Sequence, residues 1–124
     1  MCSVLMSIRP EFVHQIMAGK KKYEYRKKVC KKNIDRIYIY STVPVCKIVG
    51  EAEVESVLIK TPEELWEKTK DEAGIDKDFY DSYYANREEA VAYKLINIKR
   101  YKKPKTLKEF GVNVAPQSYQ YIEF

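Results

Sequence analysis

The sequence predicts an α+β fold, a mixed β-barrel with flanking helices and a two-helix insertion. Segments that alternate between apolar and polar residues recur along the chain, and residues 35–42 (DRIYIYST) are the clearest of them. An acidic pair of predicted helices at about 61–86 separates two long predicted strands. The 124 residues amount to one domain, whose hydrophobic core needs no disulfide support. We therefore expect a single domain over 1–124.

The first elements are a strand over Val4–Ile8 and a helix that begins at Pro10. Gly19 ends this helix, because glycine accepts the left-handed conformation that follows a helix C-terminus. The buried face of the helix is expected to carry Phe12, Val13, Ile16 and Met17.

The next strand is predicted at residues 22–26, where the side-chain period is two. Glu24 and Arg26 then project to one face, roughly 7 Å apart along the strand, within reach of one planar polar ligand such as a base edge or a phosphate. Tyr23 and Tyr25 project to the other face. The alternative is an edge strand whose charges only meet water.

The remaining strands are expected at residues 35–42, 47–59, 90–101 and 119–124. Within the insertion, Thr61 precedes Pro62 and is followed by Glu64, the pattern of a capping box. Gly74 ends this helix, and Asp76 is placed to cap the second one.

Charge is distributed unevenly along the chain, whose net charge is +5. Residues 62–86 carry eight acidic and three basic side chains, whereas residues 20–36 carry nine bases and residues 94–108 seven bases with no acid. The two basic segments are candidates for one positive surface that attracts polyanions, although such faces also serve solubility alone. Since an acidic helix pair would be repelled by phosphates, a helix-turn-helix that binds DNA is disfavoured.

Metal, cofactor and membrane functions find no support in the sequence. Cys2, Cys30 and Cys46 have no C-x-x-C spacing, and His14 is the only histidine, so we expect free thiols, no metal site and no cofactor. There is no apolar run of about 20 residues that would span a bilayer and no signal-like N-terminus. The expected location is the cytoplasm.

The segment Gly19-x-Lys21-x-x-Glu24-x-Arg26 resembles the G-x-K-x-x-E-x-R motif of the ASCH domain family, a branch of the PUA-like superfamily of small β-barrels associated with RNA. The segments 7–12 (SIRPEF) and 115–119 (APQSY) resemble its strand-to-helix junction and a closing segment of its longer members.

The resemblance implies a PUA-like barrel with a cleft beside the motif that accepts a nucleotide or a modified base. A related branch contains small amidohydrolases that act on acetylated cytidine, with a lysine and a hydroxyl side chain three residues later. Lys21 matches that lysine, but Glu24 replaces the hydroxyl side chain.

We therefore expect an RNA- or nucleotide-binding module. Its expected contact residues are Lys20, Lys21, Lys22, Glu24, Arg26, Lys27, Tyr40, Ser41, Thr42, Gln117 and Ser118. The alternative for Tyr40 is packing in the barrel wall.

Two other functions stay open. One is a small metal-independent hydrolase, a ribonuclease or an amidohydrolase of acylated nucleosides, with Lys21, Glu24 and Arg26 as its catalytic residues. The other is a transcription-related adaptor that binds a protein partner through the acidic insertion. Neither turnover nor the oligomeric state follows from the sequence.

Overall fold

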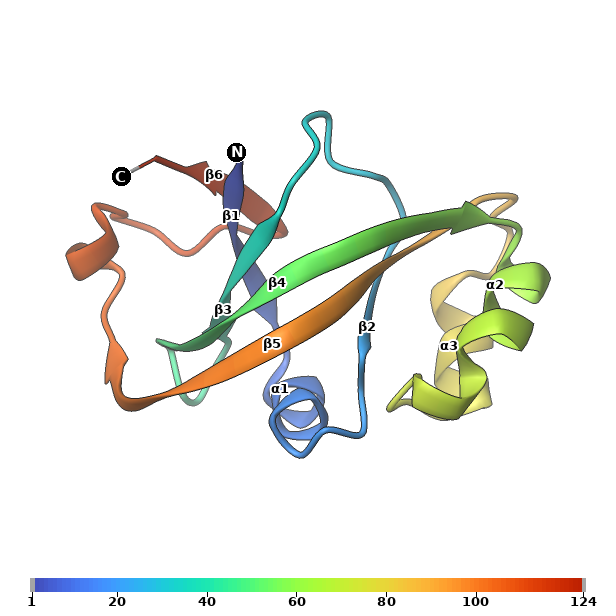
Figure 1. Ribbon diagram of the computed structural model, residues 1–124, viewed down its shortest axis with the longest axis horizontal. Coiled ribbons are helices and arrows are strands. Elements are labelled where there is room, and N and C mark those ends of the chain that lie inside the picture. The colour runs from blue at the N-terminus through green and yellow to red at the C-terminus, as the bar shows by residue number, and fades with distance from the viewer. Residues whose placement is uncertain (1, 124) are drawn as a thin grey trace.

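The computed structural model describes residues 2–123, which form one mixed sheet of six strands with three α-helices around it (Figure 1). The strands are β1 (Ser3–Ile8), β2 (Tyr23–Arg26), β3 (Arg36–Ser41), β4 (Lys47–Lys60), β5 (Ala90–Lys105) and β6 (Tyr119–Ile122). The helices are α1 (Pro10–Met17), α2 (Pro62–Thr69) and α3 (Lys77–Tyr83), with short 3₁₀ turns η1 (Lys70–Glu72) and η2 (Lys108–Phe110). The α+β class and the order of elements predicted from the sequence are confirmed.

The sheet is a curled half-barrel and not the closed barrel that we expected. Its strand order is β2-β5-β4-β3-β1-β6, with β1 and β3 parallel and the other pairs antiparallel. The two edge strands, β2 and β6, have four residues each and do not pair with each other. A side-chain bond closes this gap instead, because Arg26 at the end of β2 donates to the Ser118 hydroxyl just before β6 at 3.0 Å. We call this gap the seam.

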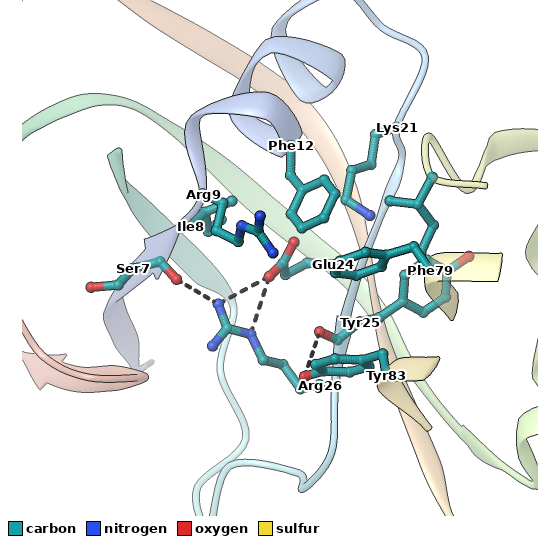
Figure 2. Close-up of a pocket in the computed structure, with 11 residues that line it drawn as sticks. Ser7, Ile8, Arg9, Phe12, Lys21, Glu24, Tyr25, Arg26, Phe79 and Tyr83 are labelled. Atoms are coloured by element: carbon teal, nitrogen blue, oxygen red, sulfur yellow. Dashed lines mark hydrogen bonds and ion pairs between the residues drawn. The ribbon is translucent and has the colours of Figure 1, made fainter. Parts of the chain in front are cut away.

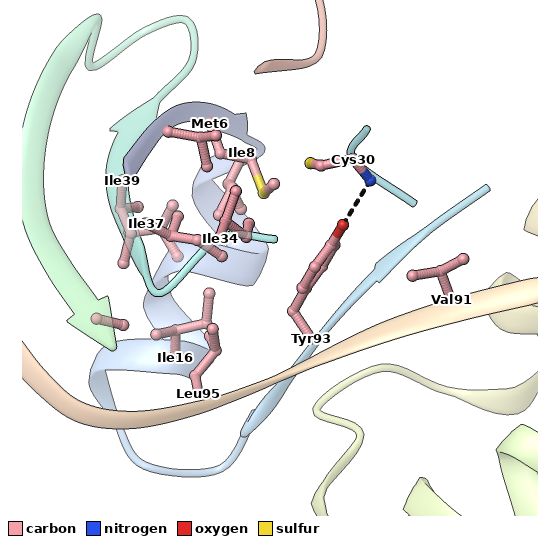
Figure 3. Close-up of a cluster of buried hydrophobic side chains, with 13 residues drawn as sticks. Met6, Ile8, Ile16, Cys30, Ile34, Ile37, Ile39, Val91, Tyr93 and Leu95 are labelled. Carbon is pink, nitrogen blue, oxygen red and sulfur yellow. Dashed lines mark hydrogen bonds between the residues drawn. The ribbon is translucent and has the colours of Figure 1, made fainter. Parts of the chain in front are cut away.

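The main hydrophobic core lies between α1 and the sheet (Figure 3). Val13 and Ile16 of α1 are buried there, as their helical spacing predicts. The Tyr93 hydroxyl accepts a hydrogen bond from the backbone N–H of Cys30 at 2.8 Å, so the loop after β2 is tied to β5. Cys2, Cys30 and Cys46 are free thiols.

The insertion between β4 and β5 begins with the predicted caps. The Thr61 hydroxyl accepts from the backbone N–H of Glu64 and donates to its carboxylate, and the Asp76 carboxylate accepts from the backbone N–H of Phe79 at 2.7 Å. The insertion also covers the edge of the sheet, since the Tyr84 hydroxyl donates to the carbonyl of Arg26 at 2.9 Å. The insertion is thus fastened to the strand that carries the motif.

The two basic segments adjoin where Lys94 of β5 lies opposite Tyr23 of β2, and their other ends separate. Figure 1 shows the loop that follows β2 and the C-terminal end of β5 at opposite sides of the molecule. The exposed bases of β5 and its following turn are Lys99, Arg100, Lys102, Lys103, Lys105 and Lys108. Within residues 2–123, no helix has the length and apolar character needed to cross a membrane.

Candidate functional site

A cavity of about 210 Å³ lies beside the seam, bounded by β1, α1, β2 and the insertion (Figure 2). Its polar lining residues are Ser7, Arg9, Lys21, Glu24 and Arg26. Its apolar lining residues are Ile8, Phe12, Tyr25, Ile75, Phe79 and Tyr83. This seam cavity brings together the lysine, glutamate and arginine of the motif.

Glu24 and Arg26 form a largely buried ion pair. The Nε and one terminal nitrogen of Arg26 lie 3.1 and 3.0 Å from the same Glu24 carboxylate oxygen, and the two side chains are only 14% and 7% exposed. The guanidinium also donates to the Ser7 carbonyl at 2.9 Å and to the Ser118 hydroxyl. These bonds use most of the N–H donors of Arg26 and hold its guanidinium plane across the seam.

Lys21 is buried, with 2% of its surface exposed. Its Nζ donates to the Ala73 carbonyl at 3.0 Å and lies 4.6 Å from the centre of the Tyr25 ring and 5.4 Å from that of Phe12. Burial lowers the pKa of Lys21 to about 8, the Glu24 carboxylate opposes this shift, and Arg26 adds to it. A lysine with so low a pKa exchanges its proton near neutral pH, which makes it available for proton transfer as well as for binding anions.

Two glycines place Lys21 in this position. Gly19 adopts a left-handed φ of +77° directly after α1 and turns the chain toward β2, as predicted. Gly74 has a φ of +65°, and a Cβ at this position would lie 2.8 Å from the Cα of Lys21. The insertion can therefore close over Lys21 only because residue 74 has no side chain.

Aromatic side chains of the insertion form one wall of the cavity. The Phe79 ring packs edge-to-face on Phe12 with centroids 5.1 Å apart, and Tyr83 stacks parallel to Phe79 at 6.3 Å. The Arg9 guanidinium lies 5.6 Å from the centres of both phenylalanine rings. The helical spacing of these insertion aromatics is typical of core residues, so nothing in the sequence indicated that they line a cavity.

The other predicted contact residues divide into three groups. Lys20, Lys22 and Lys27 are exposed near the cavity, and Lys22 forms an ion pair with Glu72 at 3.0 Å. Ser118 holds Arg26, and Gln117 beside it is exposed. The residues at the end of β3 do not line the cavity.

Tyr40 alternates with Ile39, so its side chain projects to the opposite face of the sheet. It packs there in a second cluster with Leu5 and Ile48. Ser41 is buried, and the backbone N–H of Thr42 donates to the carbonyl of Ile8 at 3.1 Å. These placements fit the barrel-wall alternative for Tyr40. Over residues 2–123, there is no group of three or more His, Cys, Asp or Glu side chains that could hold a metal ion.

The site is thus a buried lysine and an ion pair at the open seam of a curled mixed sheet in an α+β domain. Residues 6–104 match the ASCH domain, and the chain belongs to the ASCH domain family. The crystal structure of ASCH from Zymomonas mobilis has the same fold, with a TM-score of 0.88 and 28% identity over 98% of this chain and 87% of that one.

Two further relatives match shorter parts of the chain. The ASCH domain-containing ribonuclease of Zymomonas mobilis is 33% identical over 92 residues, 73% of this chain and 62% of that protein. The large ribosomal subunit protein uL22 of Ureaplasma parvum is 34% identical over 88 residues, 71% of this chain and 28% of that protein. The chain therefore spans less than two thirds of the length of either relative.

Proposed function

We propose that this ASCH domain binds RNA at the seam, with Lys21, Glu24 and Arg26 at the centre of the contact. The observation that carries the proposal is the convergence of these three side chains on one partly open cavity. The similarity to a protein named as a ribonuclease supports RNA as the ligand.

Lys21, Glu24 and Arg26 are largely buried, so solvent weakens their interactions with a ligand less than it weakens those of exposed charges. A cation that is already desolvated interacts strongly with a phosphate or a base, whereas an exposed lysine loses most of its interaction to water and salt. Lys21 is held by the Ala73 carbonyl and two aromatic faces, so it reaches the cavity in one orientation. Polar groups that are fixed in advance bind a ligand with little further loss of entropy.

The test is a titration of the protein with single-stranded RNA, comparing Lys21→Met with Lys22→Met. Both variants lose one positive charge in adjacent positions, but Lys21 is buried and Lys22 is exposed. We expect Lys21→Met to weaken binding roughly 10- to 100-fold, because a buried charged contact contributes about 1.5–3 kcal/mol. The proposal fails if the two variants bind RNA equally well.

RNA cleavage is a second candidate, favoured by the named ribonuclease and by the lowered pKa of Lys21. In this reaction the Glu24 carboxylate accepts the proton of a ribose 2′-hydroxyl, and the 2′-oxygen bonds to the phosphorus. The bond from phosphorus to the 5′-oxygen breaks, and protonated Lys21 gives its proton to that oxygen. The products are a 2′,3′-cyclic phosphate and a 5′-hydroxyl, with Arg26 offsetting the added negative charge in the transition state.

The nature of the products and the effect of Glu24→Gln test this candidate. We expect RNA fragments with 2′,3′-cyclic phosphate ends to accumulate with the wild-type protein. They should also accumulate with the control variant Glu55→Gln, because Glu55 is exposed. Glu24→Gln should lose most of this cleavage but still bind RNA. Cleavage at an unchanged rate in Glu24→Gln would exclude this role and indicate a contaminating nuclease.

A further inference from the structure

A second concave site, of about 1040 Å³, lies between α2 and α3 of the insertion. Its volume is at the upper end of the roughly 300–1,000 Å³ of sites that enclose a drug-sized ligand, so it has room for several side chains of a peptide. The motif residues Lys21, Glu24 and Arg26 do not line it. We call this site the insertion groove.

The insertion groove carries negative charge. Two bases, Lys77 and Arg87, line it together with four acids, Glu63, Glu67, Asp81 and Glu88. Lys77 is already paired with Asp81 at 2.8 Å. Glu63 and Glu88 are exposed, and neither forms an ion pair in the part of the chain that the structure describes. Both carboxylates are therefore available to a cation from outside the chain.

The floor of the insertion groove is aromatic. Trp66, Tyr80 and Tyr84 line it, and the two tyrosines are buried. The Tyr80 ring lies with its centroid 4.7 Å from that of Trp66 and 4.8 Å from that of Tyr84, and its hydroxyl donates to the carbonyl of Pro62 at 2.7 Å. Rings beside carboxylates suit a guanidinium, which stacks on a ring while its N–H groups donate to the acids.

The indole of Trp66 has contacts to spare. Elsewhere the chain places its own cations over rings, as with Lys27 over Tyr83 at 4.8 Å and Lys32 over Tyr121 at 4.9 Å. Among the described residues, none places a cation over the Trp66 ring, and none accepts a hydrogen bond from its indole N–H. Tryptophan is the ring that binds cations best, and its free N–H can donate to a peptide carbonyl.

We propose that the insertion groove binds an arginine-rich segment of another protein, with guanidinium groups on Trp66 and at Glu63 and Glu88. Charge complementarity identifies this occupant, because the carboxylates attract a cationic segment and repel a nucleic acid. The chain as a whole has a net charge of +5, so the rest of its surface does not favour such a segment. The inference is independent of RNA binding at the seam and gives the predicted partner of the acidic insertion a definite chemistry.

The first experiment uses the fluorescence of Trp66, the only tryptophan of the chain. The protein is titrated with a short labelled peptide in which arginine and glycine alternate. We expect a saturable change in Trp66 emission together with a rise in the anisotropy of the peptide label. The same peptide with lysine should bind several-fold more weakly, because an ammonium does not stack on a ring as a guanidinium does, and the peptide with glutamate should not bind. If neither signal responds to the arginine peptide, the proposal is wrong.

The second experiment removes the two available carboxylates. The double variant Glu63→Gln with Glu88→Gln should bind the arginine peptide roughly five- to tenfold more weakly. Its matched control is Glu55→Gln with Glu123→Gln, which removes two exposed acids that do not line the insertion groove. Equal affinities of the two double variants would place the peptide elsewhere and overturn the proposal.

The third experiment changes the ring. Trp66→Leu should weaken the binding of the labelled peptide several-fold, and Trp66→Phe should weaken it less, because an aromatic face remains. Wild-type affinity in Trp66→Leu would exclude the ring contact. If Trp66→Leu does not fold, the variant of Glu63 and Glu88 decides, since it changes exposed side chains only.

A second copy of this chain is the other source of cations that the test must separate. Figure 1 shows the C-terminal end of β5, with its exposed bases Lys102 and Lys103, at the opposite side of the molecule from the insertion, so these bases do not reach the groove of their own chain. We expect sedimentation at low salt to show no self-association that depends on them. Self-association that is lost both in Lys102→Met with Lys103→Met and in Glu63→Gln with Glu88→Gln would make the second copy the occupant and overturn the proposal.

Discussion

Two lysine-rich regions of this domain have nearly the same composition and very different surroundings. At the seam, Lys21 is 2% exposed and contacts a carbonyl and two aromatic rings. At the far end of β5, Lys99, Lys102 and Lys103 are all exposed to solvent. Charge count alone therefore does not distinguish the two regions, whereas enclosure of Lys21 by other elements does.

The enclosure comes from the insertion, which is the acidic part of the molecule. Its Ala73 carbonyl accepts from Lys21, and its Phe79 and Tyr83 side chains form a wall of the cavity. The binding of a protein partner to the acidic insertion stays a prediction from the sequence. The inner face contacts the motif, so the insertion and the motif form one structural unit.

The variant with the largest expected effect is Gly74→Ala, which disturbs the packing of the insertion on Lys21 without changing a charge. The new Cβ would lie 2.8 Å from the Cα of Lys21, and we expect a cost of about 1–3 kcal/mol from overpacking in addition to about 1–2 kcal/mol for the left-handed backbone. Gly111→Ala is the matched control, because Gly111 has a similar φ of +70° with nothing within 4 Å of the added Cβ. Thermal unfolding measures both, and equal losses would show that the insertion does not press on Lys21.

The second prediction compares one buried lysine with three exposed ones. Lys21→Met should weaken RNA binding roughly 10- to 100-fold. A triple variant of Lys99, Lys102 and Lys103 to methionine should weaken it less than about threefold near 0.15 M salt, and not at all at high salt, because exposed charges are screened. If the triple variant loses more RNA affinity than Lys21→Met in the same titration, the RNA contact lies at the far end of β5 and not at the seam.

The third prediction concerns the stability of the buried ion pair. Glu24→Gln leaves the Arg26 guanidinium, which is 14% exposed, without its carboxylate and should cost about 1–3 kcal/mol of unfolding free energy. Glu55→Gln should cost less than about 1 kcal/mol, because Glu55 is half exposed and lies 3.7 Å from Lys94. Denaturant unfolding of both variants gives the difference, and similar midpoints would mean that the pair at the seam is no stronger than a surface pair.

The smallest expected effect is a pH dependence of RNA binding. The pKa of Lys21 is about 8 in the folded protein, so the residue carries its charge at pH 7 and loses it as the pH rises through 8. We expect affinity to fall several-fold between pH 7 and pH 9, roughly in step with the charged fraction of Lys21. Lys21→Met should bind weakly with a flat profile over the same range. A similar slope in both proteins would assign the titration to another group.

The sequence was sufficient for features set by local chemistry. Gly19 ends α1, Thr61 caps α2 and Asp76 caps α3, and each of these depends on residues no more than three positions away. The period of two within β2 also placed Glu24 and Arg26 side by side. The family motif pointed to the same segment.

Features set by distant contacts did not follow from the sequence. Closure of the barrel depends on whether β2 and β6 pair, and these strands are far apart in the chain. Burial of Lys21 depends on the docking of Gly74, and the position of Tyr40 depends on which face of β3 meets α1. Such contacts leave no periodic signal, so they were visible only in the folded chain.

The antiparallel pairing of β1 with β6 sets where a fusion partner can be attached. Ser3 lies opposite Ile122, so the two ends of the chain leave the domain together (Figure 1). Ser7 at the cavity is about 13 Å farther along β1. A fluorescent tag or a surface linker joined beyond Ser3 or Ile122 therefore begins at the end of β1 that lies farther from the cavity.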